Sequence, residues 1–361
     1  MMKRYRSVEW VDGALRVLDQ RLLPAVCDYL DYSDYREVAA AIRKMVVRGA
    51  PAIGVAAAYG MVLAARESRA TSLAELKNEL NNAAELLQAA RPTAVNLFWA
   101  IDRMLKRVQQ AGSESPGILK DALLQEAHAI YEEDIWVNKQ IGLHGLELVS
   151  QDAVFIHHCN TGALATVDYG TALGIIRTAH EHGHKVFVYV DETRPRLQGA
   201  RLTTWELQQL GIPHQLIVDG ASGFVMASRR VDLATVGCDR VAANGDTANK
   251  IGTYNLAIVA KAHGVPFYVA APTSTIDLPL KTGAEIGIEM RAAQEITCIG
   301  SEPIAPEGTE VLNPAFDVTP PEYITAFITE GGIAYPPFAE SLPIVVQKAK
   351  ELIRQMRKGS L

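Results

Sequence analysis

From about residue 152 onward, short apolar segments alternate with longer segments that have the spacing of helices. The apolar segments are rich in β-branched and aromatic residues; they read AVFIHH, KVFVYV, HQLIVD, LATVGC and PFYVAA. An apolar run of this length is typical of a strand buried on both faces, and parallel strands need a long connection, usually a helix. The pattern therefore predicts an α/β fold with a doubly wound parallel sheet, covered by helices on both faces, over roughly residues 130–345.

The N-terminal part has a different pattern. "VEWVDGALRVLD" alternates apolar residues on both sides of Asp12-Gly13, which predicts a β-hairpin. Between about residues 35 and 111, apolar residues recur every three or four positions, as in amphipathic helices. A chain of 361 residues exceeds the usual size of one core. We therefore expect a smaller, mostly helical domain with a short antiparallel sheet over 1–128, followed by the parallel-sheet domain over 129–361.

Charge and composition exclude several classes of partner. The formal net charge is −6 and the basic residues are scattered, so nucleic acid is not expected as a partner. No apolar run reaches the length of a membrane span and no signal-peptide pattern begins the chain, so we expect a cytoplasmic protein with no membrane partner. The cysteines are widely spaced and predict free thiols rather than disulfides or a structural metal: Cys27, Cys159, Cys238 and Cys298.

Cys159 lies where the first strand of the predicted sheet ends. Ligands of such sheets bind beyond the carboxyl ends of the strands, so this position can face a ligand. We expect a helix to begin at the following "NTG", and a helix N-terminus would lower the pKa of the thiol and stabilise its thiolate. The alternative is a small buried apolar residue, which is what free cysteines commonly are.

Asp239 occupies the corresponding position after the fourth strand. Polar residues crowd "CDRVAANGDTANK", which we interpret as a loop, as we do the Pro-rich "PAFDVTPPEY". Loops at this edge of a sheet often carry function, which favours Asp239 as a functional carboxylate. The alternative is a helix cap or an ion pair with Arg240.

Several cations lie beside expected helix starts. "RGAPAIGVAAAYG" begins a Gly- and Ala-rich helix with Arg48 in front of it. Free N–H groups, close backbone approach at Gly49 and a guanidinium would form an anion site; tight helix packing is the alternative. Arg91 and Lys250 are in similar places, and together these cations predict a phosphorylated ligand.

Two other patterns point less strongly to a ligand. The histidines of "AHEHGHKV" fall where a helix ends, so we interpret them as solvated side chains near its negative end rather than as metal ligands, and we expect no metal. "NTGALA", with Asp191 ending the next strand, resembles a dinucleotide site but lacks the opening G-x-G. Nicotinamide binding stays the weaker alternative, and no cofactor is expected.

Longer motifs carry a family resemblance over about residues 46–325. They are "RGAPAIGVAAAYG", "RPTAVNLFWA", "HHCNTGALATVDYGTALG", "DETRPRLQGARLT", "GCDRVAANGDTANKIGTYNLA" and "NPAFDVTPPEYIT". In this order they resemble the methylthioribose-1-phosphate isomerase family of methionine salvage. The resemblance implies a Rossmann-like C-terminal domain, an active site between the two domains and a homodimer. It also implies conversion of 5-methylthioribose 1-phosphate, a sugar phosphate, to 5-methylthioribulose 1-phosphate.

The resemblance also implies roles for particular residues. The family's catalytic cysteine falls on Cys159 and its catalytic acid on Asp239. Cys238 departs from the alanine expected in many relatives, and we expect it to face the same site. The family's substrate contacts fall on Arg48, Gly49, Ala50, Arg91, Gln198, Asn249 and Lys250.

The chemistry leaves two routes open. Phosphate on the anomeric oxygen prevents ring opening to a free aldehyde, so an acid, Asp239 in our hypothesis, must protonate the ring oxygen. Hydrogen then moves from C2 to C1 as a hydride, or Cys159 as a thiolate removes the C2 proton.

Two alternative functions remain. The non-catalytic regulatory subunits of translation initiation factor 2B share this fold, but they need no cysteine and aspartate pair. An isomerase of ribose 1,5-bisphosphate or 5-deoxyribose 1-phosphate would keep that pair and differ around the sugar's C5.

Overall fold

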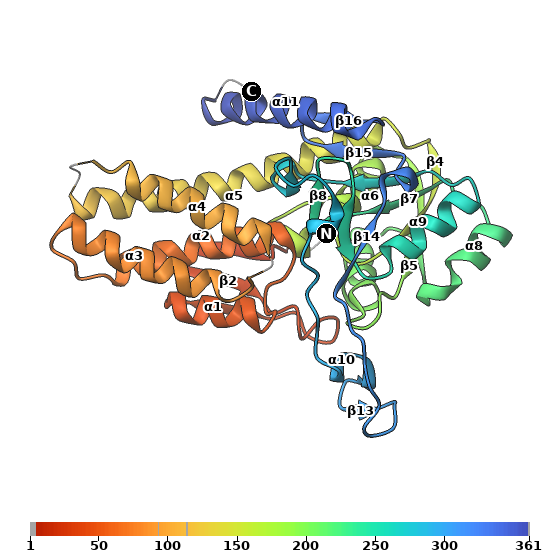
Figure 1. Ribbon diagram of the computed structural model, residues 1–361, viewed down its shortest axis with the longest axis horizontal. Helices are drawn as coiled ribbons and strands as arrows, with labels where there is room; N and C mark the ends of the chain where they lie inside the picture. Colours follow the sequence, from red (N-terminus) through yellow and green to blue (C-terminus); the bar gives the residue numbers. More distant parts are fainter. Residues whose placement is uncertain (1–4, 93, 113–114, 360–361) are drawn as a thin grey trace.

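The computed structural model describes residues 5–92, 94–112 and 115–359. A bundle of helices lies beside the large sheet, and the last helix runs along one side of both (Figure 1). The chain begins with an antiparallel sheet formed by β1 (Val8–Val11), β2 (Ala14–Leu18) and β3 (Tyr29–Tyr32). Asp12 and Gly13 both have positive φ, 50° and 87°, as the tight turn of a hairpin requires, so the predicted hairpin is confirmed.

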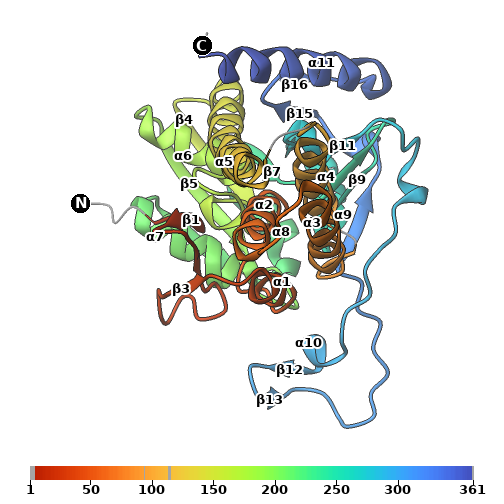
Figure 2. The same cartoon turned by 90° about the vertical axis from the view of Figure 1, so that its left-hand side faces the viewer.

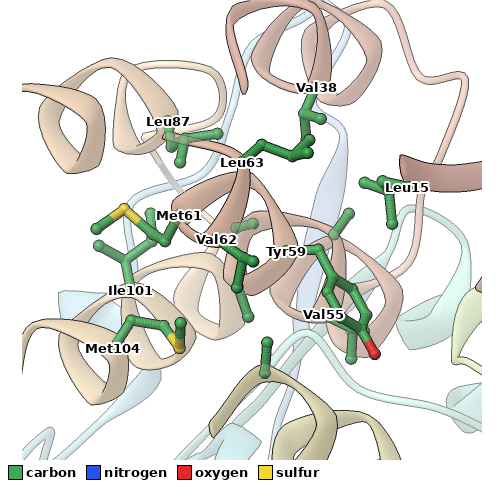
Figure 3. Close-up of a cluster of buried hydrophobic side chains, with 14 of the residues drawn as sticks. Leu15, Val38, Val55, Tyr59, Met61, Val62, Leu63, Leu87, Ile101 and Met104 are labelled. Atoms are coloured by element: carbon green, nitrogen blue, oxygen red, sulfur yellow. The ribbon is translucent and has the colours of Figure 1, made fainter. Parts of the chain in front are cut away.

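The helical bundle surrounds α2. Its helices are α1 (Tyr35–Arg43), α2 (Ala50–Glu67), α3 (Leu73–Gln88) and α4 (Val95–Gln109), joined by the first half of α5 (Pro116–Leu146). Residues 52–65 of α2 are all buried, which its glycines and alanines permit because they let the neighbouring helices approach closely. Figure 3 shows Val38 of α1, Leu87 of α3 and Ile101 of α4 around the α2 side chains. The helical character predicted for this region is confirmed.

The described residues also form a seven-stranded sheet with the order β16-β15-β10-β7-β4-β5-β6. All neighbours are parallel except β15 and β16. The five predicted strands are present, and β15 and β16 were not predicted. The bounds are β4 (Asp152–His157), β5 (Lys185–Asp191), β6 (His214–Ile217), β7 (Leu233–Val236), β10 (Phe267–Ala270), β15 (Ala326–Thr329) and β16 (Gly332–Ala334).

Helices cover both faces of this sheet. Successive strand residues point to opposite faces, so Phe155 packs in a core with α5 and α6, whereas Ile156 packs in a core with α8, α9 and α11. The predicted doubly wound fold is therefore confirmed. The helices are α6 (Ala172–Glu181), α7 (Thr204–Leu210), α8 (Ser222–Ser228), α9 (Thr253–Ala262) and α11 (Phe338–Arg357).

A second, smaller sheet corrects the prediction of loops at residues 238–250 and 314–323. Its order is β11-β8-β9-β14. The prediction failed because β9 has a polar sequence, TANK, of which three residues are nevertheless buried. The bounds are β8 (Arg240–Ala242), β9 (Thr247–Lys250), β11 (Ile276–Asp277) and β14 (Phe316–Thr319).

An arm between β11 and β14 projects from the body in both views (Figures 1 and 2). It carries α10 (Gln294–Thr297), β12 (Cys298–Ile299) and β13 (Glu302–Pro303). Short 3₁₀ turns lie at Ala163–Ala165, Asp219–Ala221, Thr273–Thr275, Gly283–Glu285 and Pro321–Tyr323, and a π turn at Gly199–Thr203. In the described part of the chain, no helix combines the length and the apolar character needed to span a bilayer.

Candidate active site

The winding of the large sheet reverses between β4 and β7. From β4 the chain continues outward through β5 and β6, whereas β10 and β15 extend the sheet beyond β7 on the other side. Open α/β sheets bind ligands in the crevice at such a reversal. Cys159 follows β4 by two residues and Asp239 follows β7 by three, so both lie at this crevice.

A cavity of about 410 Å³ occupies this crevice. One wall comes from the start of α2 and the loop before α4, and another from the carboxyl edge of the sheet. All the residues predicted for the site line this cavity: Arg48, Gly49, Ala50, Arg91, Cys159, Gln198, Asp239, Asn249 and Lys250.

Two threonines hold the backbone of Cys159. The residue is buried and its φ is 69°, a left-handed conformation that is uncommon for residues other than glycine. Its N–H donates to Thr193 Oγ1 at 2.9 Å, and its carbonyl accepts from Thr203 Oγ1 at 2.7 Å. These bonds stabilise a conformation that would otherwise cost about 1–3 kcal/mol.

The protonation state of Cys159 differs from the prediction. Burial raises the pKa of the thiol, and the charges of Arg48 and Lys250 offset this only in part. The predicted helix start is also wrong, because a 3₁₀ turn at Ala163–Ala165 intervenes and α6 begins only at Ala172. Cys159 is therefore a neutral thiol at pH 7 rather than a thiolate stabilised by a helix.

The Asp239 carboxyl is directed to the cavity rather than to a protein partner. Arg240 pairs with Asp277 at 2.6 Å, which removes the alternative of an Asp239–Arg240 ion pair. Within residues 5–92, 94–112 and 115–359, no group donates a hydrogen bond to the Asp239 carboxyl. Burial raises its pKa, although the charges of Lys250, Arg91 and Arg48 act in the opposite direction. A protonated carboxyl with no internal partner can serve as an acid for a bound ligand.

Arg48 is fixed by two partners and retains a free donor. Its Nε donates to Gln20 Oε1 at 3.1 Å and its Nη1 to the carbonyl of Asn160 at 2.9 Å. Its Nη2 is buried without a hydrogen-bond partner in the described structure. Gly49 caps α2 with a φ of 95°, and a Cβ there would lie 2.3 Å from the Ala165 oxygen. The close backbone approach predicted at this position is present.

The other cations and amides come from separate elements. Arg91, in the loop before α4, pairs with Glu289 at 3.2 Å. Lys250 Nζ donates to the Ala315 carbonyl at 2.9 Å, and burial lowers the pKa of this ammonium. Asn249 is buried on β9, and Gln198 is buried with Oε1 lacking a partner among the described residues.

Several residues that form or support the site were not predicted. Gln20 and Asn160 orient Arg48; the position of Asn160 beside Cys159 was a usable signal, whereas Gln20 offered none. Residues 286–289 and Arg291, at the base of the arm, form a further wall. Cys238 lines the cavity as expected; burial raises the pKa of its thiol to about 12, and its Sγ lies 3.0 Å from Thr275 Oγ1.

One cluster outside the cavity has the composition of a metal site. Ligand atoms of His158, Asp191 and Asp219 lie within 4.8 Å of one another. Each residue already has protein partners, however, because Asp219 accepts from the backbone N–H groups of Thr193 and Arg194 and His158 bonds to Asp191. The cluster is therefore explained as a hydrogen-bond network.

The histidines at the end of α6 lie where predicted.

The chain and its fold are similar to those of known proteins. A model of the Initiation factor 2 subunit family matches residues 46–336. "Methylthioribose-1-phosphate isomerase" of Synechococcus sp. is 59% identical over 345 residues, which cover 96% of this chain and 99% of the relative.

Two solved structures are also similar. The crystal structure of 5-methylthioribose 1-phosphate isomerase from Pyrococcus horikoshii superposes with a TM-score of 0.90 at 44% identity, covering 96% of this chain and 97% of that one. A structure described as translation initiation factor eIF-2B, subunit delta, from A. fulgidus has a TM-score of 0.86 at 45% identity, covering 95% and 100%.

Proposed function

This chain belongs to the initiation factor 2 subunit family, and on that premise we propose that it is a methylthioribose-1-phosphate isomerase. It converts 5-methylthioribose 1-phosphate, an aldose derivative, to 5-methylthioribulose 1-phosphate, a ketose derivative, in methionine salvage. The observation that carries the proposal is the single cavity that Cys159 and Asp239 share with Arg48 and Lys250. A regulatory subunit needs no such cavity, so the pair favours an enzyme over a scaffold.

In this proposal the substrate phosphate lies near the start of α2. The free Nη2 of Arg48 and the N–H groups at Gly49 and Ala50 are suited to an anion, as helix N-termini are. Lys250 adds a positive charge, and Gln198 and Asn249 add amide groups. Binding through several fixed donors orients the sugar and so lowers the entropic part of the barrier.

The apolar part of the cavity lining suits a methylthio group. Its lining includes the apolar side chains of Met45, Phe98, Ile286 and Ile288. The cavity's Arg291 pairs with Glu289 at 2.7 Å, so its charge is balanced within the protein. A second phosphate, as in ribose 1,5-bisphosphate, would lose water there without gaining an unpaired cation.

Asp239 is the proposed acid. In its protonated form it donates a proton to the ring oxygen as the C1–O4 bond breaks, which leaves a cation at C1. A hydride then moves from C2 to C1, and the C2 hydroxyl returns its proton to the Asp239 carboxylate. The acid is regenerated and the sum of the steps is an isomerisation, so no cofactor is needed.

The neutral thiol of Cys159 favours this hydride route. Proton abstraction at C2 needs a thiolate, and the raised pKa of Cys159 disfavours that form. Cys159 then acts as a buried wall of the cavity beside the migrating hydrogen. Substrate with deuterium at C2 separates the routes: retention of the label at C1 agrees with the hydride shift, whereas washout into solvent water would show proton abstraction.

Turnover by the purified protein tests the function itself. The substrate is 5-methylthioribose 1-phosphate, compared with ribose 1,5-bisphosphate and 5-deoxyribose 1-phosphate. We expect the first to be used best, and Asp239→Asn to lower kcat by about a hundredfold or more. Cys159→Ser should also lower kcat, while Cys298→Ser, on the projecting arm, serves as the matched control. Absence of turnover on every substrate would contradict the proposal.

We further propose a cytoplasmic homodimer with two domains, 1–128 and 129–361. Three large apolar side chains at the β6 edge of the sheet and on α8 are 50%, 59% and 71% exposed: Leu216, Val218 and Phe224. Exposed apolar side chains of this size support contact with a second copy. The hydrophobic cores support a division within α5, a few residues after the proposed bound. Apart from Val167, the core of the bundle ends at Tyr131, and a core of the large sheet begins at Val137. Light scattering of the purified protein tests the dimer.

A further inference from the structure

His158 bonds to two different elements directly behind the active-site cysteine. Its Nδ1 lies 3.0 Å from Asp191 Oδ2 at the end of β5. Its Nε2 lies 2.9 Å from the backbone oxygen of Ile251, in the turn that follows β9. The side chain is 1% exposed, so no water competes for either contact.

These partners define the protons on the imidazole. A carbonyl oxygen can only accept, so Nε2 must carry a proton to bond to Ile251. At Nδ1 we assign the proton between ring and carboxyl to His158, because a carboxyl is ordinarily more acidic than an imidazole by roughly 2.5 pKa units. Burial raises the pKa of Asp191, and its bond to His158 acts in the opposite direction. Burial lowers the pKa of His158, but the bond to Asp191 and the charges of Asp191 and Asp219 outweigh it and the pKa is raised.

The turn that His158 holds carries two substrate-binding candidates. Asn249 and Lys250 immediately precede Ile251, so the bond to the Ile251 oxygen fixes the end of β9 against the end of β4. The imidazole also packs closely against the backbone of this turn, because a Cβ on Gly252 would lie only 2.8 Å from His158 Cε1. On the far side, the Gly252 N–H donates to Asp317 of β14 at 2.8 Å.

We propose that His158 is a positioning residue for the isomerase reaction: as a buried imidazolium paired with Asp191, it holds Asn249 and Lys250 in register with Cys159. The proposal rests on the function proposed above. Charged and titratable groups from each neighbouring element are accounted for: Asp191 from β5, Asp219 from the turn before α8, Asp317 from β14 and His157 from β4. The three carboxyl groups favour the cation, whereas burial and His157 oppose it.

His157 provides a matched comparison on the same strand. It is fully buried, but its two nitrogens face hydroxyl groups, Thr235 Oγ1 at 3.0 Å and Thr161 Oγ1 at 3.1 Å. Hydroxyls can donate or accept, so this ring is satisfied as a neutral imidazole. Burial lowers its pKa to about 3. Loss of His157 therefore removes a similar volume and similar hydrogen bonds without removing a charge.

The kinetic test uses three variants alongside a wild type already shown to turn over. His158→Asn removes the ring, and Asp191→Asn keeps the ring but removes its counter-charge. We expect both to raise KM by about tenfold or more with a smaller change in kcat, since loss of a charged hydrogen bond is worth this much. His157→Asn should lower the melting temperature while KM stays within about threefold. An equal rise in KM for His157→Asn, or no rise for the other two, overturns the proposal.

A second measurement does not depend on activity or on the stability of a variant. In wild-type protein labelled with ¹⁵N-histidine, both ring nitrogens of His158 should give the signals of a protonated imidazolium at pH 7. The signal of a neutral ring at that pH overturns the proposal even if the enzyme is active. Conversely, an imidazolium signal in a protein without turnover would contradict the proposed function but would support the pairing of His158 with Asp191.

Discussion

Cys159 and Asp239 extend from neighbouring parallel strands, β4 and β7, which pair with His157 opposite Thr235. This relationship places a thiol and a carboxyl at one crevice although they are 80 positions apart in the sequence. Burial raises the pKa of both groups, which favours their protonated forms although several cations lie nearby.

The pH dependence of activity should show which acid matters. The pKa of Asp239 is raised, so the protonated, active form persists above the usual carboxyl range and is lost as pH rises further. We expect kcat/KM to fall on the alkaline side, and Asp239→Glu to keep a falling limb while Asp239→Asn loses it. A rate that instead rises with pH through the thiol range would indicate a Cys159 thiolate as the working group.

Gly49→Ala should impair both folding and substrate binding. The new methyl group would meet the Ala165 backbone in a conformation with φ of 95°. We expect a loss of about 3 kcal/mol or more in the free energy of unfolding, together with a raised KM. Gly183→Ala is the control, because its φ is 82° but nothing lies within 4 Å of the added atom. Gly183→Ala should lower the free energy of unfolding by only about 1 kcal/mol, as measured by urea titration. Equal losses in the two variants would show that the methyl group at position 49 meets no clash.

Arg48→Lys tests the fork geometry of the proposed phosphate site. A lysine retains the charge but cannot bond to Gln20 and the Asn160 carbonyl while presenting a third fixed donor. We expect KM to rise about tenfold with a smaller change in kcat. Arg230→Lys changes an exposed pair with Asp232 and should leave both constants unchanged. An unaltered KM in Arg48→Lys would place the phosphate elsewhere.

Glu330 should make stability depend on pH. Burial raises its pKa to about 7, although its carboxyl accepts bonds from Thr273. The stability contributed by protonated Glu330 is fully present below the pKa of a glutamate in the unfolded chain, near 4, and is lost as pH rises through about 7. Relative to Glu330→Gln, wild-type unfolding free energy should fall by about 3 kcal/mol between about pH 4.5 and 7.5. Glu340→Gln, exposed on α11, is the control; a constant difference between wild type and Glu330→Gln would refute the shift.

Activity should survive removal of divalent metals. The carboxylates of Asp191 and Asp219 and both nitrogens of His158 are engaged with protein partners, so an ion would have to displace those bonds. We expect unchanged kcat after dialysis against a chelator. If a divalent ion restored activity lost on dialysis, and did not restore it in Asp219→Asn, a metal would belong in this cluster.

The parallel strands could be predicted because burial on both faces leaves a continuous apolar run, as at Phe155 and Ile156. The strand β9 could not be predicted from periodicity, because it presents Asn249 and Lys250 to the cavity and its pairing with β14 depends on residues far away. A functional strand with polar residues resembles a loop when only composition is considered.

The sequence predicted which residues form the candidate site better than it predicted their backbone conformation and protonation. The family motifs contained all nine residues predicted for the site, but a cysteine gives no sign of positive φ, which usually belongs to glycine. The neutral thiol was also missed, because the burial that raises its pKa exists only in the folded structure. Gln20 reaches the site only through tertiary packing.

The helix α5 has a consequence for how the molecule comes apart. It is a continuous rod of 31 residues, about 46 Å long, whose first half belongs to the bundle core and whose second half packs against the sheet. Ile130 and Val137 lie in different cores only two turns apart. Melting one core would leave half of the rod unsupported, and an isolated helix of that length is marginal in water. The two halves of the protein should therefore denature together, as one cooperative thermal transition.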